Sequence, residues 1–333
     1  MNNGALNGIR VLELVRKLAM DSDVLLENYK VGDLKRYGLD YDSLRALNPR
    51  LIYCSVTGFG QTGPMAARPG YDGLFQALGG LMAVSGRPDD EPGGGPMKTG
   101  PSLVDIMTGY NAVIAILAAL NYRHNTGKGQ YIDLALLDCA VAAVSHITQD
   151  YLVSGVAAKR SGNAGNGGGP ADLIPCKDGT VYLSAGTQEH WRRLCELMGK
   201  PGLFADPRFD SNLQRGQNRR ELIPIISEWS RGWAADDLVD ALDRIAVPAA
   251  RYNELSEVFE DAQVKHRGLR KTVAHPVSGT VQLIGSPLAY MSETPVDHLQ
   301  APPTLGQHTD DILRERLGLD DQEIARLRSA GVI

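Results

Sequence analysis

Residues 97–141 read MKTGPSLVDIMTGYNAVIAILAALNYRHNTGKGQYIDLALLDCAV, and the rest of the chain is organised around them. The middle of this stretch predicts a long helix over about residues 105–122, with alanines that permit close packing. A tight turn and a strand over residues 131–136 follow it. The apolar face of the predicted helix is formed by Val113, Ile114, Ile116, Leu117 and Leu120.

One carboxylate, Asp105, lies between Val104 and Ile106 at the start of this helix. A charge in such surroundings needs hydrogen bonds or a chemical role, because its lost water shell must be replaced. Residues 102–105 fit a capping box with Ser102 as the N-cap, and an acid in the first turn suits the helix dipole. The position also suits a carboxylate nucleophile. The pattern alone leaves both interpretations open.

Residues 99–138, TGPSLVDIMTGYNAVIAILAALNYRHNTGKGQYIDLALLD, resemble the central signature of the class III CoA-transferases, the CaiB/BaiF family. This family includes formyl-CoA transferase and the 2-methylacyl-CoA racemases. In it, the aspartate that matches Asp105 attacks an acyl-CoA thioester. The resemblance therefore implies that Asp105 is a nucleophile, and it extends over nearly the whole chain with one gap near the start.

The composition indicates a soluble globular enzyme, with 43% hydrophobic and 22% charged residues in a chain of 333. A net charge of -5 without a dense Lys/Arg cluster argues against a nucleic-acid or membrane partner. No secretory leader precedes Ile9 and we expect no apolar run of membrane-spanning length, so the expected location is cytoplasmic. Neither the four cysteines nor the histidines show metal-ligand spacing, and no metal site is expected.

The N-terminal part alternates between predicted strands and helices. A helix over residues 42–47 ends at Asn48-Pro49, between the second and third strands. Apolar strands that alternate with helices predict a Rossmann-like α/β fold with a parallel sheet. The three predicted strands cover residues 9–14, 24–28 and 51–56.

The connection between the first two predicted strands is short. Only residues 15–23 separate them, near the lower limit for a crossover that carries a helix. Members of the family normally have a longer segment here, with basic residues that reach the CoA nucleotide. The resemblance therefore implies weakened CoA binding.

Four positions are candidate contacts to CoA or its acyl group. Asn28 and Arg36 resemble an asparagine and an arginine that contact CoA in the family, although a strand-end turn and a solvated cation explain them equally well. Gly58 starts a glycine-rich turn. Such a turn lets a ligand approach the backbone, and a plain turn without a ligand is the alternative. Tyr71 stands where the racemases have a proton-moving histidine. Because the unperturbed pKa of tyrosine is ~10, Tyr71 favours transfer over racemisation, with core packing as the alternative.

Residues 160–170, RSGNAGNGGGP, contain five glycines and cannot hold a regular element. They resemble the glycine-rich lid of formyl-CoA transferase, which covers the aspartyl intermediates. The resemblance implies that Gly167, Gly168 and Gly169 contact the bound acyl group, and a simple interdomain linker is the alternative.

We expect a large α/β domain that begins with residues 1–165, a smaller α+β domain over residues 166–255, and a linker and return to the large domain over residues 256–333. The resemblance implies a homodimer of two interlocked rings. Smaller elements predicted from pattern are helices over residues 137–152, 189–198, 218–229, 235–245 and 257–269, a hairpin over residues 173–184 with an Asp-Gly turn, strands around residues 272–277 and 281–283, and Thr309 as a helix N-cap.

The function implied by the resemblance is transfer of CoA from an acyl-CoA donor to a free carboxylic acid, through an aspartyl anhydride and an aspartyl-CoA thioester on Asp105. Coenzyme A and acyl-CoA are substrates, and no prosthetic group is implied. Residues 145–152 and 329–332 resemble members that use succinyl-CoA and dicarboxylates. A 2-methylacyl-CoA racemase, or a catalytically silent CoA-binding paralogue, remains an alternative.

Overall fold

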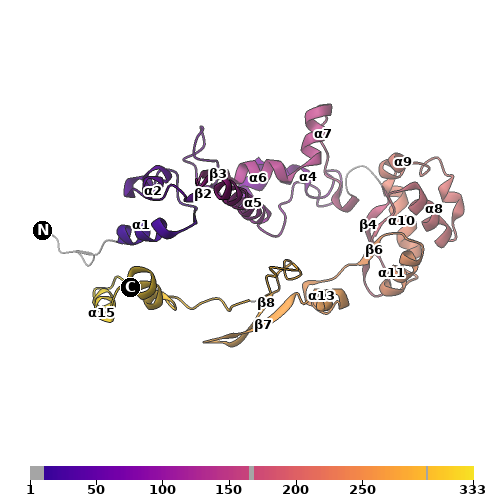
Figure 1. The fold of residues 1–333 in the computed structure, drawn as a ribbon. Helices are drawn as coiled ribbons and strands as arrows, with labels where there is room; N and C mark the ends of the chain where they lie inside the picture. Colours follow the sequence, from indigo (N-terminus) through magenta and orange to yellow (C-terminus); the bar gives the residue numbers. More distant parts are fainter. Residues whose placement is uncertain (1–10, 165–168, 298) are drawn as a thin grey trace. The chain divides into compact units, whose positions relative to one another are not determined.

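The computed structural model of the chain describes residues 11–164, 169–297 and 299–333 (Figure 1). The chain divides into two compact units. The first unit contains both chain ends, Met1–Arg160 and Leu305–Ile333, and the second unit is the continuous segment Ser161–Thr304.

The described part of the chain begins with a helix, α1 (Val11–Asp21), and not with the strand expected over residues 9–14. Residues 9 and 10 lie outside the described residues. The helix forms because apolar residues recur three or four positions apart, which is a helical period. Ala19 of this helix is buried in a cluster with Leu39 and Leu44. The expected strand-to-strand crossover is therefore wrong, and α1 leads directly into the sheet.

A three-stranded parallel sheet forms the centre of the first unit, which confirms the predicted α/β class. The middle strand is buried, and the register pairs Glu27 with Ser55 and Thr57 with Ala135. The carboxyl ends of the strands therefore lie at one edge of the sheet. The strands are β1 (Val24–Glu27), β2 (Ile52–Thr57) and β3 (Tyr131–Ala135), and α2 (Tyr41–Leu47) precedes β2.

The helix expected over residues 137–152 is two helices. The break falls at Ser145, whose φ of 53° is in the left-handed region that a helix does not use. A sequence pattern does not show such a backbone turn, since the apolar residues continue across it. The helices of this region are α3 (Asp72–Leu78), α4 (Leu81–Val84), α5 (Leu103–Thr126), α6 (Leu136–Ala143) and α7 (His146–Ser154).

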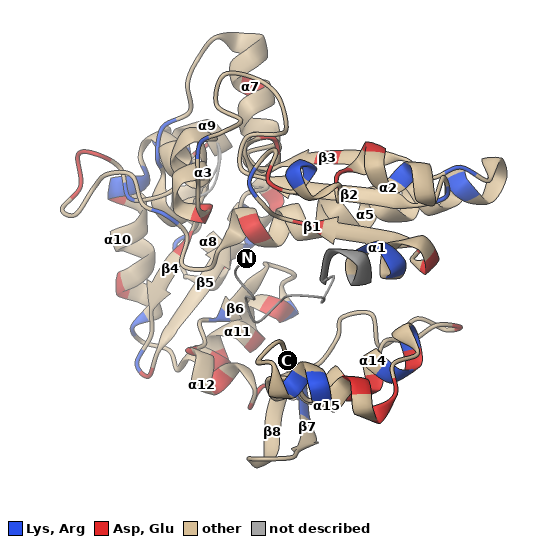
Figure 2. Ribbon diagram, turned by 90° about the vertical axis from the view of Figure 1, so that its left-hand side faces the viewer, with Lys and Arg blue, Asp and Glu red and all other residues tan. Residues whose placement is uncertain are grey.

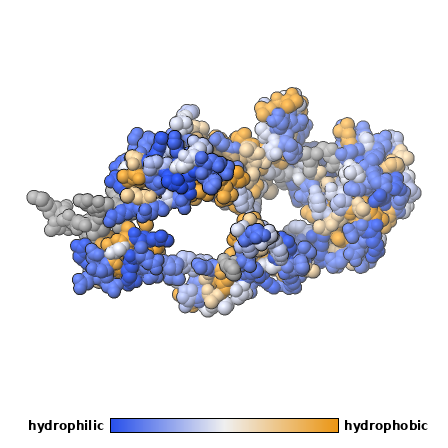
Figure 3. Space-filling model, viewed as in Figure 1, coloured by the Kyte–Doolittle hydropathy of each residue, from blue (hydrophilic) through white to orange (hydrophobic). Residues whose placement is uncertain are grey.

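The long α5 helix turns its small residues inward. Val104, Thr108, Ala112 and Ala119 are buried, and the helix packs against α3, α6, β2 and β3. The expected apolar face exists, but much of it is exposed in the single chain (Figure 3). We call its exposed row, which repeats at helical spacing, the α5 stripe: Ile106, Tyr110, Val113, Ile114 and Leu117.

By length and composition α5 could cross a membrane, so the expectation that no apolar run reaches that length is wrong. These two properties are weak evidence for a span, because core helices of soluble proteins share them. In this chain one side of α5 is occupied by its own sheet and by two helices. The α5 stripe lies on the exposed part of the helix.

The second unit is an α+β arrangement, and it begins with the expected hairpin. The strands β4 (Ala171–Pro175) and β5 (Thr180–Ser184) pair antiparallel, and β6 (Ala249–Arg251) joins β5. Helices bury one apolar core against this sheet, with Trp191 and Phe209 among its largest side chains. The helices are α8 (Gln188–Leu197), α9 (Asn212–Gln217), α10 (Arg219–Ser230) and α11 (Ala235–Arg244), of which three match predictions and α9 is additional.

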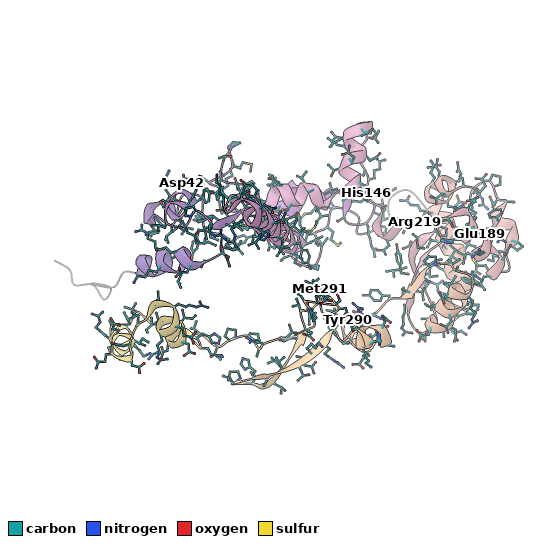
Figure 4. The ribbon with its side chains drawn as sticks, in the orientation of Figure 1. Asp42, His146, Glu189, Arg219, Tyr290 and Met291 are labelled. Carbon is teal, nitrogen blue, oxygen red and sulfur yellow. The ribbon has the colours of Figure 1, made fainter. Side chains whose placement is uncertain are left out.

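The linking helix expected over residues 257–269 is instead two short helices, α12 (Leu255–Val258) and α13 (Ala262–His266). Separate capping carboxylates, Glu254 and Asp261, start them and divide the segment. The hairpin of β7 (Arg270–His275) and β8 (Gly279–Ile284) follows as expected. Tyr290, which is labelled in Figure 4, follows the hairpin. Its ring centre lies 3.7 Å from the guanidinium carbon of Arg267, which precedes the hairpin.

Two C-terminal helices, α14 (Thr309–Leu317) and α15 (Asp321–Ser329), complete the first unit. The N-cap of α14 is His308 rather than the expected Thr309, which is the first helical residue. Both helices have acidic residues in the first turn and arginines in the last turn (Figure 2), and Arg328 pairs with Asp310 at 2.6 Å.

Candidate active site

Asp105 lies in the first turn of α5 and is exposed in the single chain, so a ligand can reach it. Its neighbour Val104 is fully buried and packs against Phe75 of α3 and Ala140 of α6. Partial burial raises the pKa of the Asp105 carboxyl, and the negative charge of Asp72 raises it further. Both effects make the carboxylate a better electron-pair donor than one in water.

The expected capping box is wrong. Ser102 is the N-cap residue of α5, but its side chain makes no capping hydrogen bond. Asp72 of α3 caps the helix instead: its Oδ1 accepts from the backbone N–H of Val104 at 2.8 Å and of Asp105 at 3.3 Å. The carboxylate comes from a different element, so the local pattern at residues 102–105 could not reveal it.

Two further residues hold Asp72 in place. The Nε2 of Gln76, one helical turn along α3, donates to Asp72 Oδ2 at 2.6 Å. Gln76 is fully buried, and its Oε1 accepts from Thr99 through the backbone N–H at 2.9 Å and the hydroxyl at 3.2 Å. The three side chains thus connect α3, the segment before α5, and the first turn of α5.

Gly58 lies just beyond the carboxyl end of β2, where the sequence predicts a ligand turn. A Cβ built on Gly58 would lie 2.7 Å from Cζ of Phe75, so the glycine lets α3 approach the sheet. Phe75 in turn contacts Val104. This packing places the start of α5 next to the carboxyl edge of β2. It also explains why a glycine is needed at position 58 without any contact to a ligand.

Asn28 follows β1 and is exposed at the same edge of the sheet. Glu27, before it, accepts hydrogen bonds from Ser55 Oγ and from the N–H of Tyr29. Arg36 is exposed in the short helix Lys35–Tyr37 and pairs with Asp33 at 3.5 Å. These two residues are reachable by a ligand, and their contact with CoA remains a prediction.

Tyr71 is 86% exposed in the single chain, so the core-packing alternative is wrong for it. It is the N-cap residue of α3 and immediately precedes Asp72. The tyrosine is therefore fixed beside the residue that caps α5, and its side chain is free to contact a ligand.

In the glycine-rich loop, Gly167 and Gly168 lie outside the described residues. Gly169 is buried in the second unit, where its N–H donates to Asn212 Oδ1 at 2.9 Å. Its carbonyl accepts from Arg215 Nε at 2.7 Å. The last glycine of the loop is thus an anchored residue.

Sequence reasoning missed Asp72 and Gln76 as site residues. Their spacing is the signal that could have found them. The two polar residues are four positions apart in a helix, and they share one helix face with Phe75. A buried polar pair on such a face needs partners. Among the described residues no group of three or more His, Cys, Asp and Glu could hold a metal ion.

The fold and site define an α/β enzyme in which a carboxylate is presented in the first turn of a helix beside the carboxyl edge of a parallel sheet. The chain belongs to CoA-transferase family III, whose sequence profile matches residues 10–309. This confirms the resemblance and makes the chain a CoA-transferase of class III.

Individual relatives agree with this assignment. The chain is 41% identical over 302 residues to succinate–glutarate CoA-transferase of Agrobacterium fabrum, with 91% of this chain and 74% of the relative covered. It is 37% identical over 322 residues to succinyl-CoA:glutarate CoA-transferase of Homo sapiens, with 97% and 72% covered. Its fold is similar to the crystal structure of a CaiB/BaiF family protein from Brucella suis, with 39% identity, a TM-score of 0.81, and 94% and 80% covered.

Proposed function

We propose that this enzyme transfers CoA from succinyl-CoA to a free dicarboxylic acid, with Asp105 as the nucleophile. The observation that carries the proposal is the exposed Asp105 carboxylate with a raised pKa in the first turn of α5. The names of the relatives from Agrobacterium fabrum and Homo sapiens support the succinyl donor and a five-carbon dicarboxylate acceptor.

The proposed chemistry is a series of acyl transfers that balance without a proton or a cofactor. An Asp105 oxygen attacks the thioester carbonyl, the C–S bond breaks, and an anhydride and CoA thiolate form. The thiolate attacks the Asp105 carbonyl, releasing succinate and leaving an aspartyl-CoA thioester. The acceptor carboxylate then attacks this thioester, and the released thiolate attacks the acceptor carbonyl of the new anhydride. The products are the acceptor's CoA thioester and a regenerated Asp105.

Turnover assays and mass spectrometry test this proposal together. Incubation with succinyl-CoA alone should add CoA covalently to the peptide that contains Asp105, and glutarate should discharge it. Product that forms only when a free acid is present supports transfer. Epimerisation of a 2-methylacyl-CoA without an acid would instead support a racemase, and binding of CoA without adduct or turnover would support a silent paralogue.

The glycine-rich loop is proposed to close over the acyl group, and Gly168→Ala tests this role with Gly169→Ala as its control. A Cβ on Gly169 would meet no atom closer than 3.6 Å, so the folded second unit should tolerate alanine with a change in unfolding free energy below ~0.5 kcal/mol. Gly168→Ala should lower turnover severalfold, because a closing loop needs backbone conformations that Cβ disfavours, whereas Gly169→Ala, at the anchored end of the loop, should change turnover little. Unchanged turnover in Gly168→Ala would identify the segment as a linker.

We also propose that the protein is a homodimer in the cytoplasm and that a second copy covers the α5 stripe. An apolar row of this length is rarely left open to water by a soluble protein. A membrane is the less suitable occupant, since the opposite side of α5 packs on its own sheet and helices. The interlocked arrangement remains part of this proposal.

Substitution of the stripe tests the dimer. Ile114→Glu places a charge in the middle of the row and should convert the protein to monomers, because an unpaired buried charge is costly. Light scattering coupled to size exclusion measures the mass. Leu213→Glu, an exposed apolar position on α9, is the matched control and should leave the mass unchanged. A dimer that survives Ile114→Glu with unchanged thermal stability would show that the stripe is not the interface, because interlocked chains can stay together after a contact between them is lost.

A further inference from the structure

We propose that Asp72 is a positioning residue for CoA transfer: it occupies the capping N–H groups of α5 and thereby leaves the Asp105 carboxylate free to react. This inference rests on the proposed role of Asp105 as nucleophile. It concerns a residue of α3 that does not itself form a bond to the substrate.

The N-terminus of a helix offers unpaired N–H groups that attract any nearby carboxylate. A first-turn aspartate such as Asp105 lies close to these donors, and its carboxylate can turn toward them. A carboxylate held in that way is stabilised by hydrogen bonds, and it becomes a weaker nucleophile for the same reason. A nucleophile at this position therefore needs the donors to be occupied by another group.

Asp72 meets this need. It is only 7% exposed, and its Oδ1 accepts from the N–H of Val104 at 2.8 Å and of Asp105 at 3.3 Å. The cap is thus formed by a carboxylate that is too buried to react, and not by the Ser102 at the N-cap position, whose side chain makes no capping bond. Because Asp72 bonds the N–H of Asp105 itself, it also fixes the backbone from which the nucleophile's side chain starts.

A hydrogen bond to the second oxygen of Asp72 holds the side chain in place. Oδ2 accepts from Gln76 Nε2 at 2.6 Å, and the Gln76 amide is locked in this orientation because its Oε1 accepts from the N–H and the hydroxyl of Thr99. Gln76 is fully buried, so water does not compete for these bonds. The amide can donate to Asp72 only while its oxygen faces Thr99.

Two charged groups accompany Asp105 in this region. Asp72 repels the nucleophile's negative charge, and this repulsion contributes to the raised pKa of Asp105 after partial burial. Lys98 lies in the segment before α5, but its ammonium donates to the carbonyls of Thr99 and Gly100 at 3.1 and 3.3 Å. The negative charge of Asp72 therefore disfavours a turn of the Asp105 carboxylate toward the N-terminus of α5. The hydrogen bonds that Asp72 accepts from the backbone N–H groups of Val104 and Asp105 hold the start of the helix.

The test uses a charge swap within the locked pair. In Asp72→Asn the amide oxygen can still accept from α5, but its NH₂ faces the NH₂ of Gln76, and the cap loses its charge. The double variant Asp72→Asn, Gln76→Glu restores every hydrogen bond, because the new carboxylate accepts from Asn Nδ2 and from Thr99. It moves the negative charge one helical turn away from Asp105.

We expect Asp72→Asn to lower kcat for succinyl-CoA and glutarate by about tenfold or more, with KM changed less than about twofold, because a misplaced nucleophile affects the reaction step. The acidic limb of kcat/KM should move to lower pH, since loss of the Asp72 charge lowers the pKa of Asp105. The double variant should regain the thermal stability of the wild type while kcat remains low.

Asp40→Asn is the matched control, because Asp40 caps α2 through the N–H and hydroxyl of Ser43. It should lower stability while kcat and the pH profile stay unchanged. Wild-type kcat and pH profile in Asp72→Asn would overturn the proposal, as would full recovery of kcat in the double variant, which would assign Asp72 a structural role only. Activity of the Asp105→Asn variant would instead refute the proposed role of Asp105 as the nucleophile.

Discussion

Asp105→Asn should abolish CoA transfer, with turnover reduced by at least about a thousandfold, as expected when a covalent nucleophile is removed. The amide keeps the size of the carboxylate but has no anionic oxygen to attack a thioester. The α5 cap belongs to Asp72 and not to Asp105, so the fold should be unchanged. Steady-state assays with succinyl-CoA and glutarate measure the loss, and circular dichroism checks the fold.

The matched control is Asp138→Asn, which changes an exposed first-turn carboxylate of the neighbouring helix α6. It should retain turnover within about twofold, as surface substitutions away from a site usually do. Mass spectrometry excludes deamidation of the new asparagine and follows the CoA adduct. Turnover above a few per cent of wild type in undeamidated Asp105→Asn would eliminate Asp105 as the nucleophile.

Arg215→Ala should destabilise the second unit by about 3 kcal/mol or more, because several buried acceptors lose their donor. Arg215 is 0% exposed and bonds the carbonyls of Gly169 and Phe209 and the side chain of Gln188. Burial lowers the pKa of Arg215, but an arginine remains charged at neutral pH. Its guanidinium also lies 5.5 Å from the ring centre of Trp191, so truncation leaves a cavity beside that ring.

Tryptophan fluorescence measures this effect selectively. The three tryptophans of the chain, Trp191, Trp229 and Trp233, all belong to the second unit. Denaturant titration followed at their emission therefore reports on that unit, while far-ultraviolet circular dichroism reports on both. Arg231→Ala, at an exposed arginine after α10, should change the midpoint little. Equal midpoints for the two variants would contradict the expected effect.

The sequence predicted features that depend on short-range patterns. Apolar strands next to turn residues gave β1, β2 and the hairpin of β4 and β5, and the apolar period gave α5. The resemblance around Asp105 gave the family. Residues 11–14 were misassigned because a short apolar run suits a strand and a helix equally, and their continuation to Ala19 decides for a helix.

The site was predicted less completely, because its geometry depends on contacts between distant segments. Asp72 lies 33 positions before Asp105, and a serine at the expected N-cap gave a sufficient local explanation. The outward direction of the α5 stripe was equally hidden, since the period of a helix shows which residues share a face but not what covers it. The left-handed backbone of Ser145 has no signature in residue type.

The division of the first unit between both chain ends sets an order of events during synthesis. Helix α1 packs against α14, which is translated only after the second unit. At about 5–20 residues per second, translation of Ser161–Thr304 delays that partner by about 7–30 s. The second unit is continuous and can complete its core within this interval. The nascent N-terminal segment must meanwhile wait with its α14-binding surface uncovered, so chaperone binding during translation should concentrate there.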